Sequence, residues 1–307
     1  MAEMDGGAEK PQIQQSFRDD PPSPYGKLYL VGTPIGNLED MTFRAVQTLK
    51  EADWIAAEDT RQTRKLLSRF DIHGRLVSYH EHNKEKSGKT LLSRLLAGES
   101  VALVTDAGMP AISDPGADLA AEAAARGIDV VPVPGPNAAL TALVASGLPA
   151  DHFTFFGCLP REKKKAEELL KRWEPHPFTM LFYEAPHRIA ATLKLMLDVW
   201  GDRRAVLARE LTKRYEEFAR GTLSSCLRHV TETGATGEYC LIVEGNRSAA
   251  AGDAGETGWW VSLTPEEHVA VYERKEGLSR MEAIKRAAGD RKMPKRELYR
   301  LIHTSKK

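Results

Sequence analysis

Short apolar runs alternate with amphipathic segments through the first half of the chain. Each run is rich in β-branched residues and ends in a loop with Gly, Pro, Asp or Asn, which is typical of a buried strand. The predicted strands are Lys27–Val31, Trp54–Ala57, Arg75–Tyr79, Val101–Val104 and Val130–Val133. Helices are predicted over Thr42–Lys50, Leu91–Leu96, Ala117–Arg126 and from Asn137 to Gly147. This alternation predicts an α/β fold, with a parallel sheet covered on both faces.

The pattern changes after Pro149, where strands become more frequent. Strands are predicted at His152–Gly157, Phe178–Tyr183, from Arg204 to Glu210, at Glu216–Ala219 and at Glu238–Val243. Helices are predicted in the basic segment 158–173, at Ile189–Trp200 and at Leu223–Val230. This spacing indicates a second α/β domain with some antiparallel pairing. We therefore expect an N-terminal domain over residues 26–149 and a C-terminal domain over residues 150–246.

The two ends of the chain have a different composition. Residues 1–25 have almost no large apolar side chains, which predicts a disordered leader. Residues 247–262 are rich in Gly and Ala and read as a linker. Residues 263–307 are predicted to be helical, because Thr264 and Ser279 each begin a capping-box pattern and Pro294 begins a third amphipathic segment.

Charge changes the interpretation of this C-terminal tail. The whole chain has 43 Lys+Arg and 43 Asp+Glu, but residues 271–307 have twelve basic and five acidic side chains, an excess of +7. Short basic helices joined by a tight turn are typical of a helix-turn-helix outline, which favours nucleic acid binding. The alternative is a packing appendage with a solvated basic face.

Composition otherwise indicates an ordinary globular protein. Apolar residues make up 42% and charged residues 28%, and no apolar run approaches the roughly 20 residues that span a bilayer. We therefore expect a cytoplasmic protein without membrane contact. The three cysteines lack CxxC spacing, and the His80–Asn83 cluster lacks further ligands, so reduced thiols and no metal site are expected.

Loops that follow the predicted strands are the candidate site, because ligands of α/β proteins bind at the carboxyl ends of strands. Gly32–Asn37 has two glycines and a proline but matches neither a Walker loop nor a dinucleotide fingerprint. The loop after Val104 adds Asp106 to small residues that let a ligand approach the backbone. The alternative interpretation of this loop is a tight structural turn, in which Asp106 bonds only to its own backbone. Asn137 is a predicted helix N-cap in either case.

Charged groups follow three of the predicted strands. One group begins with Glu58 and ends with Arg61, another is Glu184 to Arg188, and a third is Glu210 to Lys213. Charge at strand ends often belongs to a site. The first group could instead be the N-cap of a helix with a solvated Arg61, and each Arg–Glu set could be an ion pair that shapes a cleft.

In chain order, the loops are GTPIGN, EDTR, DAGMPAISDPG, PGPNA, EAPHR, ARELTK and GEYCLIVEG. Together they resemble the tetrapyrrole methylase family of S-adenosylmethionine-dependent methyltransferases, from about Lys27 to Asn246. The resemblance implies that each subunit has two α/β domains with the cofactor in the cleft between them, and that the protein is a homodimer. The cofactor contacts that it implies are Pro34, Asp106, Gly108, Met109, Asn137, Ala138, Tyr183 and Leu211.

Within this family, the resemblance is to members that methylate the ribose 2′-oxygen of a cytidine in 16S rRNA, in the 30S subunit. Transfer from a sulfonium requires alignment and no metal, whereas a ribose hydroxyl gains from a base or a cation. We expect Glu184 or Glu210 as the base with Lys213 beside it. Glu58, Arg61 and Arg188 are expected to bind RNA.

Two other functions are compatible with the fold. One is carbon methylation of a corrin or porphyrin precursor, which EDTR, EAPHR and the basic tail argue against. The other is a non-catalytic RNA-binding assembly factor, which would bind no cofactor.

Overall fold

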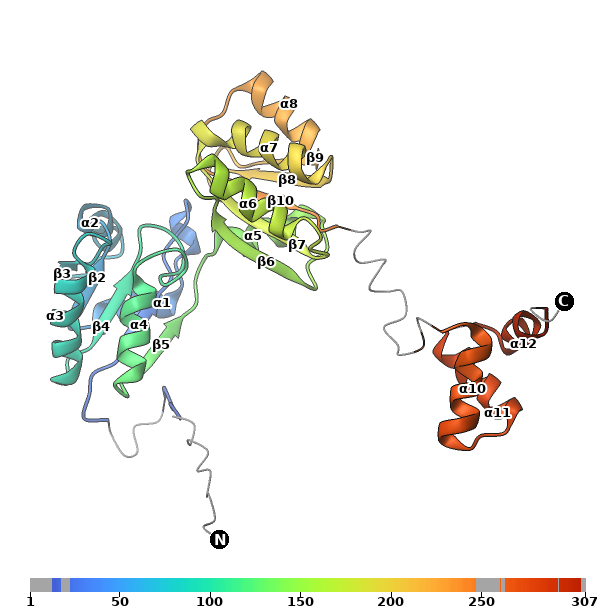
Figure 1. The fold of residues 1–307 in the computed structure, drawn as a ribbon. Coiled ribbons are helices and arrows are strands. Elements are labelled where there is room, and N and C mark those ends of the chain that lie inside the picture. The colour runs from blue at the N-terminus through green and yellow to red at the C-terminus, as the bar shows by residue number, and fades with distance from the viewer. Residues whose placement is uncertain (1–12, 18–22, 247–259, 261–262, 292, 305–307) are drawn as a thin grey trace, which may run out of the picture. The chain divides into compact units, whose positions relative to one another are not determined.

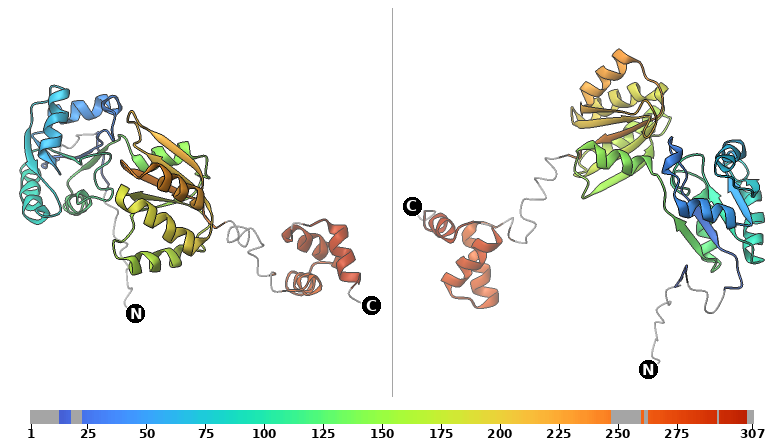
Figure 2. Two further views of the ribbon diagram at one scale, coloured as in Figure 1. Left: turned by 90° about the horizontal axis from the view of Figure 1, so that it is seen from above. Right: turned by 180° about the vertical axis from the view of Figure 1, so that it is seen from behind.

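The structure is a computed structural model that describes residues 13–17, 23–246, 260, 263–291 and 293–304. It divides into two compact units (Figures 1 and 2). Unit 1 comprises residues 1–171 and 179–244, and unit 2 comprises residues 172–178 and 245–307. Most of the predicted leader, and all but residue 260 of the predicted linker, lie outside the described residues.

The first sheet of unit 1 is fully parallel, with the strand order β3-β2-β4-β1-β5. Its strands are β1 (Leu28–Val31), β2 (Trp54–Ala57), β3 (Arg75–Ser78), β4 (Val101–Val104) and β5 (Val130–Val133). All four residues of the central strand β4 are buried. A strand buried on both faces needs an uninterrupted apolar sequence, and β4 has one. Because every strand pair of this sheet is parallel, the predicted parallel sheet is confirmed.

Helices cover both faces of this sheet (Figure 1). They are α1 (Phe43–Glu51), α2 (Thr60–Arg69), α3 (Lys84–Leu96) and α4 (Gly116–Ala125). Leu49 of α1 and Leu67 of α2 share one core cluster with Val104. Leu92 of α3 and Leu119 of α4 share a second cluster on the other face of the sheet.

The second sheet is mixed, with the strand order β6-β7-β10-β8-β9. Its strands are β6 (Phe153–Cys158), β7 (Thr179–Glu184), β8 (Arg204–Arg209), β9 (Glu217–Thr222) and β10 (Tyr239–Val243). β6 and β7 are parallel, whereas β10 runs antiparallel to β7 and β8, and β9 runs antiparallel to β8. The antiparallel pairing predicted for this half is confirmed.

The helices of this half are α5 (Ala138–Ser146), α6 (Lys163–Trp173), α7 (Pro186–Trp200) and α8 (Leu223–Thr233). Leu143 of α5 packs with Leu181 and Ile242 of the second sheet. Phe182 follows Leu181 in β7, and the centroid of its ring lies 6.1 Å from that of Trp200 in α7. Helix α5 precedes Ala150 in the chain but packs on the second sheet. The domain boundary that the sequence predicts near Ala150 therefore stays a prediction.

Some elements extend beyond the predicted ones. α3 begins at Lys84, well before the predicted Leu91, because Gly88 is buried next to Tyr79 and packing compensates for the polar sequence KEKSGK. A short 3-10 helix, η1 (Leu38–Asp40), was not predicted; it is capped by the Asn37 side chain, which accepts a hydrogen bond from the Glu39 N–H.

The described part of the leader contacts edge strand β5. The Gln14 side chain donates to the Val130 carbonyl over 3.0 Å and accepts from the Val130 N–H over 2.9 Å. Lys27 also donates to the Ser16 carbonyl over 3.2 Å. Thus one side-chain amide satisfies both backbone groups of an edge residue, as a neighbouring strand would.

The described residues of unit 2 that follow residue 260 form the helices α10 (Pro265–Glu276), α11 (Arg280–Asp290) and α12 (Lys295–Thr304). Their common core includes Val269, Ile284, Leu298 and Ile302. The backbone N–H groups of Thr264 and Ser279 donate to carboxylates three residues later, as the predicted capping boxes require. The predicted helical appendage is therefore present.

No described helix is long and apolar enough to cross a bilayer. Among these residues, no group of three or more His, Cys, Asp or Glu side chains is arranged to hold a metal ion.

Candidate binding pocket

A pocket of about 460 Å³ lies where loops of the first sheet meet strand ends of the second. The first sheet contributes loop residues that follow β1, β4 and β5: Ile35, Ala107, Gly108, Met109, Ile112, Asn137 and Ala138. The second half contributes Cys158, Tyr183, Glu184, Ala185, Pro186, Ala208, Glu210, Leu211, Lys213, Glu238, Tyr239 and Cys240. The lining combines main chain and apolar side chains with a few carboxylates and one lysine.

Three loops of the first sheet pack against one another through glycines. A Cβ atom on Gly32 would lie 2.7 Å from the Cα of Gly135 and 2.8 Å from the Met109 sulfur, so the site accepts only glycine. Gly108 has φ +83°, and its N–H and carbonyl pair with Thr33 over 3.1 and 2.9 Å. The loops after β1, β4 and β5 therefore form one backbone-lined wall.

The wall also touches the second half at the loop after β8. A Cβ on Gly36 would collide with the side chain of Lys213. Ile35, the neighbour of Gly36, and Lys213 both line the pocket, so the two halves of unit 1 meet in its lining.

Six of the eight residues expected to contact the cofactor line this one pocket. They are Gly108, Met109, Asn137, Ala138, Tyr183 and Leu211, whereas Pro34 and Asp106 are not among the lining residues. The Tyr183 hydroxyl accepts a hydrogen bond from the Ala139 N–H over 3.1 Å, and burial raises the pKa of Tyr183 to about 12. The Asn137 side chain caps α5 by accepting from the Leu140 N–H over 3.0 Å.

Asp106 lies beside the pocket wall and ties two loops together. Its carboxylate accepts a hydrogen bond from the Asp59 N–H over 3.0 Å. Desolvation raises the pKa of Asp106; that hydrogen bond opposes the shift, and the charges of Glu58 and Asp59 add to it. Asp106 therefore links the loop after β4 to the start of α2, and its role in cofactor binding stays a prediction.

Glu184 lines the pocket and is surrounded by hydrogen-bond donors. Its side chain is 1% exposed. One oxygen accepts from the Thr192 hydroxyl over 2.6 Å, and the other accepts from the Ala185 N–H over 3.0 Å and lies 3.3 Å from Arg188 Nε. Arg188 also donates to the Leu159 carbonyl over 2.9 Å. Glu184 and Arg188 thus form an internal ion pair, and Arg188 itself does not line the pocket.

Glu210, Lys213 and Glu238 form a second charged group in the lining, and their side chains are less buried than that of Glu184. Lys213 Nζ lies 3.0 Å from Glu210 and 2.9 Å from Glu238, and Glu210 also accepts from the Glu238 N–H over 3.0 Å. That backbone hydrogen bond and Lys213 lower the pKa of Glu210. Burial opposes the charge of Lys213, but its hydrogen bonds to Glu238 and Glu210 outweigh it and raise the Lys213 pKa.

Backbone strain accompanies this group. Glu210 has φ +49° and Thr212 has φ +66°, a left-handed conformation that non-glycine residues rarely adopt. Strain of this kind is commonly retained at ligand sites.

Glu58 and Arg61 lie outside the pocket lining. Asp59 caps α2, and Arg61, 83% exposed, lies 2.9 Å from the Asp59 carboxylate. This hydrogen-bonded pair lowers the pKa of Asp59 to about 2. Glu58 accepts from the Thr105 hydroxyl over 3.0 Å. The N-cap interpretation therefore describes the local structure, and RNA contacts by Glu58, Arg61 and Arg188 stay predictions.

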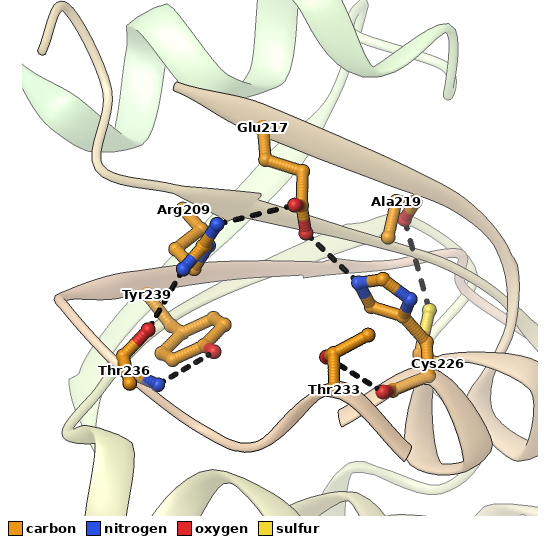
Figure 3. A network of polar contacts seen from close by, with 8 residues as sticks. Arg209, Glu217, Ala219, Cys226, Thr233, Thr236 and Tyr239 are labelled. Carbon is orange, nitrogen blue, oxygen red and sulfur yellow. Dashed lines mark hydrogen bonds and ion pairs between the residues drawn. The ribbon is translucent and has the colours of Figure 1, made fainter. Parts of the chain in front are cut away.

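The second sheet supplies pocket residues that sequence reasoning missed. Glu238, Tyr239 and Cys240 reach the pocket because β10 runs antiparallel to its neighbours, which places the start of β10 beside the ends of β7 and β8. A polar network braces this edge (Figure 3). In it, Arg209 contacts Glu217 over 3.2 Å and Thr236 over 2.8 Å, and the Thr236 N–H donates to the Tyr239 hydroxyl.

Comparison with known proteins gives several full-length relatives. A protein of Halalkalibacterium halodurans named ribosomal RNA small subunit methyltransferase I is 55% identical over 294 residues, covering 95% of this chain and 99% of the relative. A protein of the same name from Bacillus subtilis is 52% identical, covering 92% of this chain and 95% of the relative.

A solved structure has the same fold at lower identity. It is uroporphyrin-III C-methyltransferase of Thermus thermophilus in complex with S-adenosylhomocysteine, with a TM-score of 0.51 and 21% identity over 73% of this chain and all of that one. A sequence profile of the tetrapyrrole (corrin/porphyrin) methylases matches residues 27–226. The chain therefore belongs to the tetrapyrrole methylase family.

Proposed function

We propose that this protein is an S-adenosylmethionine-dependent methyltransferase that methylates the ribose 2′-oxygen of a cytidine in 16S rRNA. The observation that carries the proposal is the near full-length similarity, at 55% and 52% identity, to two relatives named ribosomal RNA small subunit methyltransferase I. We further propose that it acts on the 30S subunit in the cytoplasm and does so as a homodimer.

The pocket suits the proposed cofactor. Its volume of about 460 Å³ lies within the range of about 300–1,000 Å³ that small-molecule sites occupy. Met109, Ile112 and Leu211 offer apolar surface to an adenosyl group, and the wall of glycines offers backbone groups at close range. The cofactor would supply an activated methyl group, and carboxylates in the lining would favour its positive charge.

The two candidate bases differ in availability. Glu184 is buried, and its oxygens already accept from Thr192, Ala185 and Arg188. Glu210 is less buried, with a side chain that is 21% exposed, and the hydrogen bonds that it accepts from Lys213 and from the Glu238 N–H go to one of its oxygens, Oε1. We therefore assign proton removal from the ribose hydroxyl to Glu210, and to Glu184 the positioning of the pocket wall through Arg188.

Lys213 completes this arrangement. Its raised pKa keeps the ammonium group charged at neutral pH, so it can stabilise a developing alkoxide or hold a nearby phosphate. Arg61 is exposed enough to meet a second phosphate of the RNA. The family chemistry itself requires alignment of the hydroxyl with the methyl group.

The direct test is methyl transfer to ribosomal subunits. Purified protein is incubated with methyl-labelled S-adenosylmethionine and 30S subunits from a strain that lacks the homologous enzyme. The 16S rRNA is then digested, and mass spectrometry should find one 2′-O-methylcytidine. Label that enters added uroporphyrinogen instead would favour the tetrapyrrole alternative. Absence of cofactor binding by calorimetry would favour a non-catalytic assembly factor.

A further inference from the structure

Helix α12 of unit 2, which is labelled in Figure 1, has basic and aromatic residues at positions that share one face. Arg296, Tyr299, Arg300 and His303 are all exposed and follow the spacing i, i+3, i+4, i+7, which places them on one side of the helix. We call these four residues the α12 stripe. Leu298 and Ile302 point into the core of the unit, with 0% and 1% exposure. One side of α12 therefore packs in the core of unit 2, and another side exposes the stripe to solvent.

Two other arginines of unit 2 have structural partners. Arg280 of α11 lies 3.1 Å from Glu273, and Arg291 donates to His268 Nδ1 over 3.1 Å and to the Leu263 carbonyl over 2.6 Å. By contrast, Arg296 forms no ion pair within the part of unit 2 that the structure describes. The +7 excess of the tail therefore includes charge that the fold does not use.

The stripe also offers a flat ring to solvent. Tyr299 is 46% exposed, and its ring centroid lies 4.3 Å from that of His303. Glu297, the acidic residue of α12, is rotated by about 100° from Arg296 and by about 60° from Arg300, so it borders the stripe. The surface thus combines positive charge with an aromatic ring and has one carboxylate at its margin.

We infer that the α12 stripe binds an unpaired stretch of RNA, with Arg296 on a phosphate and Tyr299 stacked on a base. Guanidinium groups supply affinity for any phosphate backbone, whereas an exposed ring selects bases that are free to leave a stack. This inference rests on the proposed function, because it gives the rRNA methyltransferase a contact that is separate from its pocket.

The test uses the full-length protein and a fluorescein-labelled single-stranded oligoribonucleotide, with a duplex of the same length for comparison. Fluorescence anisotropy gives the affinity of R296E, Y299A and Y299F. K275E is the matched control, since Lys275 is exposed on α10 and its replacement makes the same charge change in the same unit. Thermal unfolding and calorimetry with S-adenosylmethionine check that fold and pocket are intact.

R296E should bind the single strand at least about fivefold more weakly, with a shallower dependence on salt, whereas K275E should change affinity less than twofold. Y299A should lose about tenfold and lower the preference for single strand over duplex, and Y299F should restore both. Equal affinities for R296E and K275E, or an unchanged Y299A, would overturn the inference. Wild-type protein that binds the oligoribonucleotide but methylates no rRNA would instead refute the proposed function and leave the stripe standing.

Discussion

The pocket of unit 1 and the α12 stripe of unit 2 present opposite chemistry. The pocket is concave and lined largely by backbone and apolar side chains, and each of its charged residues has an ion-pair partner. The stripe is a convex helix face, where Arg296 has no ion-pair partner among the described residues. The first is suited to one small molecule of fixed shape, and the second to a long polyanion of variable shape.

This difference predicts that the two regions fail independently. A pocket built on close backbone contacts is sensitive to one added carbon atom, because its neighbours cannot move apart without moving whole loops. A charged helix face tolerates changes of shape but depends on salt and on the sign of each side chain. Variants in one region should therefore leave the ligand of the other unaffected.

The largest expected effect is at Glu210. Glu210→Gln should lower the rate of methyl transfer about a hundredfold or more, because a general base contributes on that scale. Its unfolding free energy should change by less than about 1 kcal/mol, since the side chain remains partly exposed. Single-turnover assays on 30S subunits give the rate.

Glu184→Gln is the matched control for this experiment. Because Glu184 is buried and ion-paired, that variant should lose about 1–3 kcal/mol of unfolding free energy, measured by denaturant unfolding. If Glu184→Gln abolished transfer without loss of stability while Glu210→Gln remained active, the two assignments would have to be exchanged.

Removal of the chain after Gly258 is expected to have the next largest effect. The truncated protein loses the α12 stripe and should methylate 30S subunits about a hundredfold less efficiently at physiological salt, since several phosphate contacts disappear together. Calorimetry should show unchanged affinity for S-adenosylmethionine. Full methylation by the truncated protein would remove the proposed role of the tail.

Gly32→Ala addresses the pocket side of the comparison. The added Cβ would meet Gly135 and Met109 at under 3 Å, and overpacking of this kind costs about 1–3 kcal/mol. Affinity for the cofactor should fall about tenfold while RNA binding is retained. The control is Gly289→Ala in helix α11, where the added Cβ would meet no atom within 4 Å outside the helix's own backbone and alanine should stabilise the helix by about 0.5–1 kcal/mol. Equal cofactor binding by both variants would argue against the close-packed wall.

Asp106 is expected to give the smallest effect. Asp106→Ala should weaken cofactor binding about threefold, because the loop after β4 loses its hydrogen bond to the Asp59 N–H. Unchanged affinity in calorimetry would exclude this role.

Asp106→Asn isolates the charge of this side chain. Since the pKa of Asp106 is raised in the folded state, its ionised form opposes folding at pH values above that pKa and has no effect below its unfolded value near 4. Asp106→Asn should thus be more stable than wild type by under about 0.5 kcal/mol at pH 7, and equally stable at pH 3. A variant less stable than wild type at pH 7 would contradict this sign.

Much of the fold could be read from the sequence because its parallel strands are short, apolar and bounded by turn residues. The same regularity located Gly108 and Asn137, since loops after parallel strands meet at one edge of a sheet. Glu238 and Tyr239 could not be found in this way, because sequence periodicity does not reveal that β10 runs antiparallel. Nor does it reveal that Thr192 of α7, eight residues after Glu184 in the chain, donates a hydrogen bond to the Glu184 carboxylate.

The contact of Gln14 with Val130 has a consequence for handling the protein. β5 is an outer strand of the first sheet, and the unpaired peptide groups of such a strand can form hydrogen bonds with a strand of another molecule. The carboxamide of Gln14 occupies one such pair of groups. A shortened chain that starts beyond Gln14 would leave this strand uncovered, so we expect it to self-associate more readily in concentrated solution.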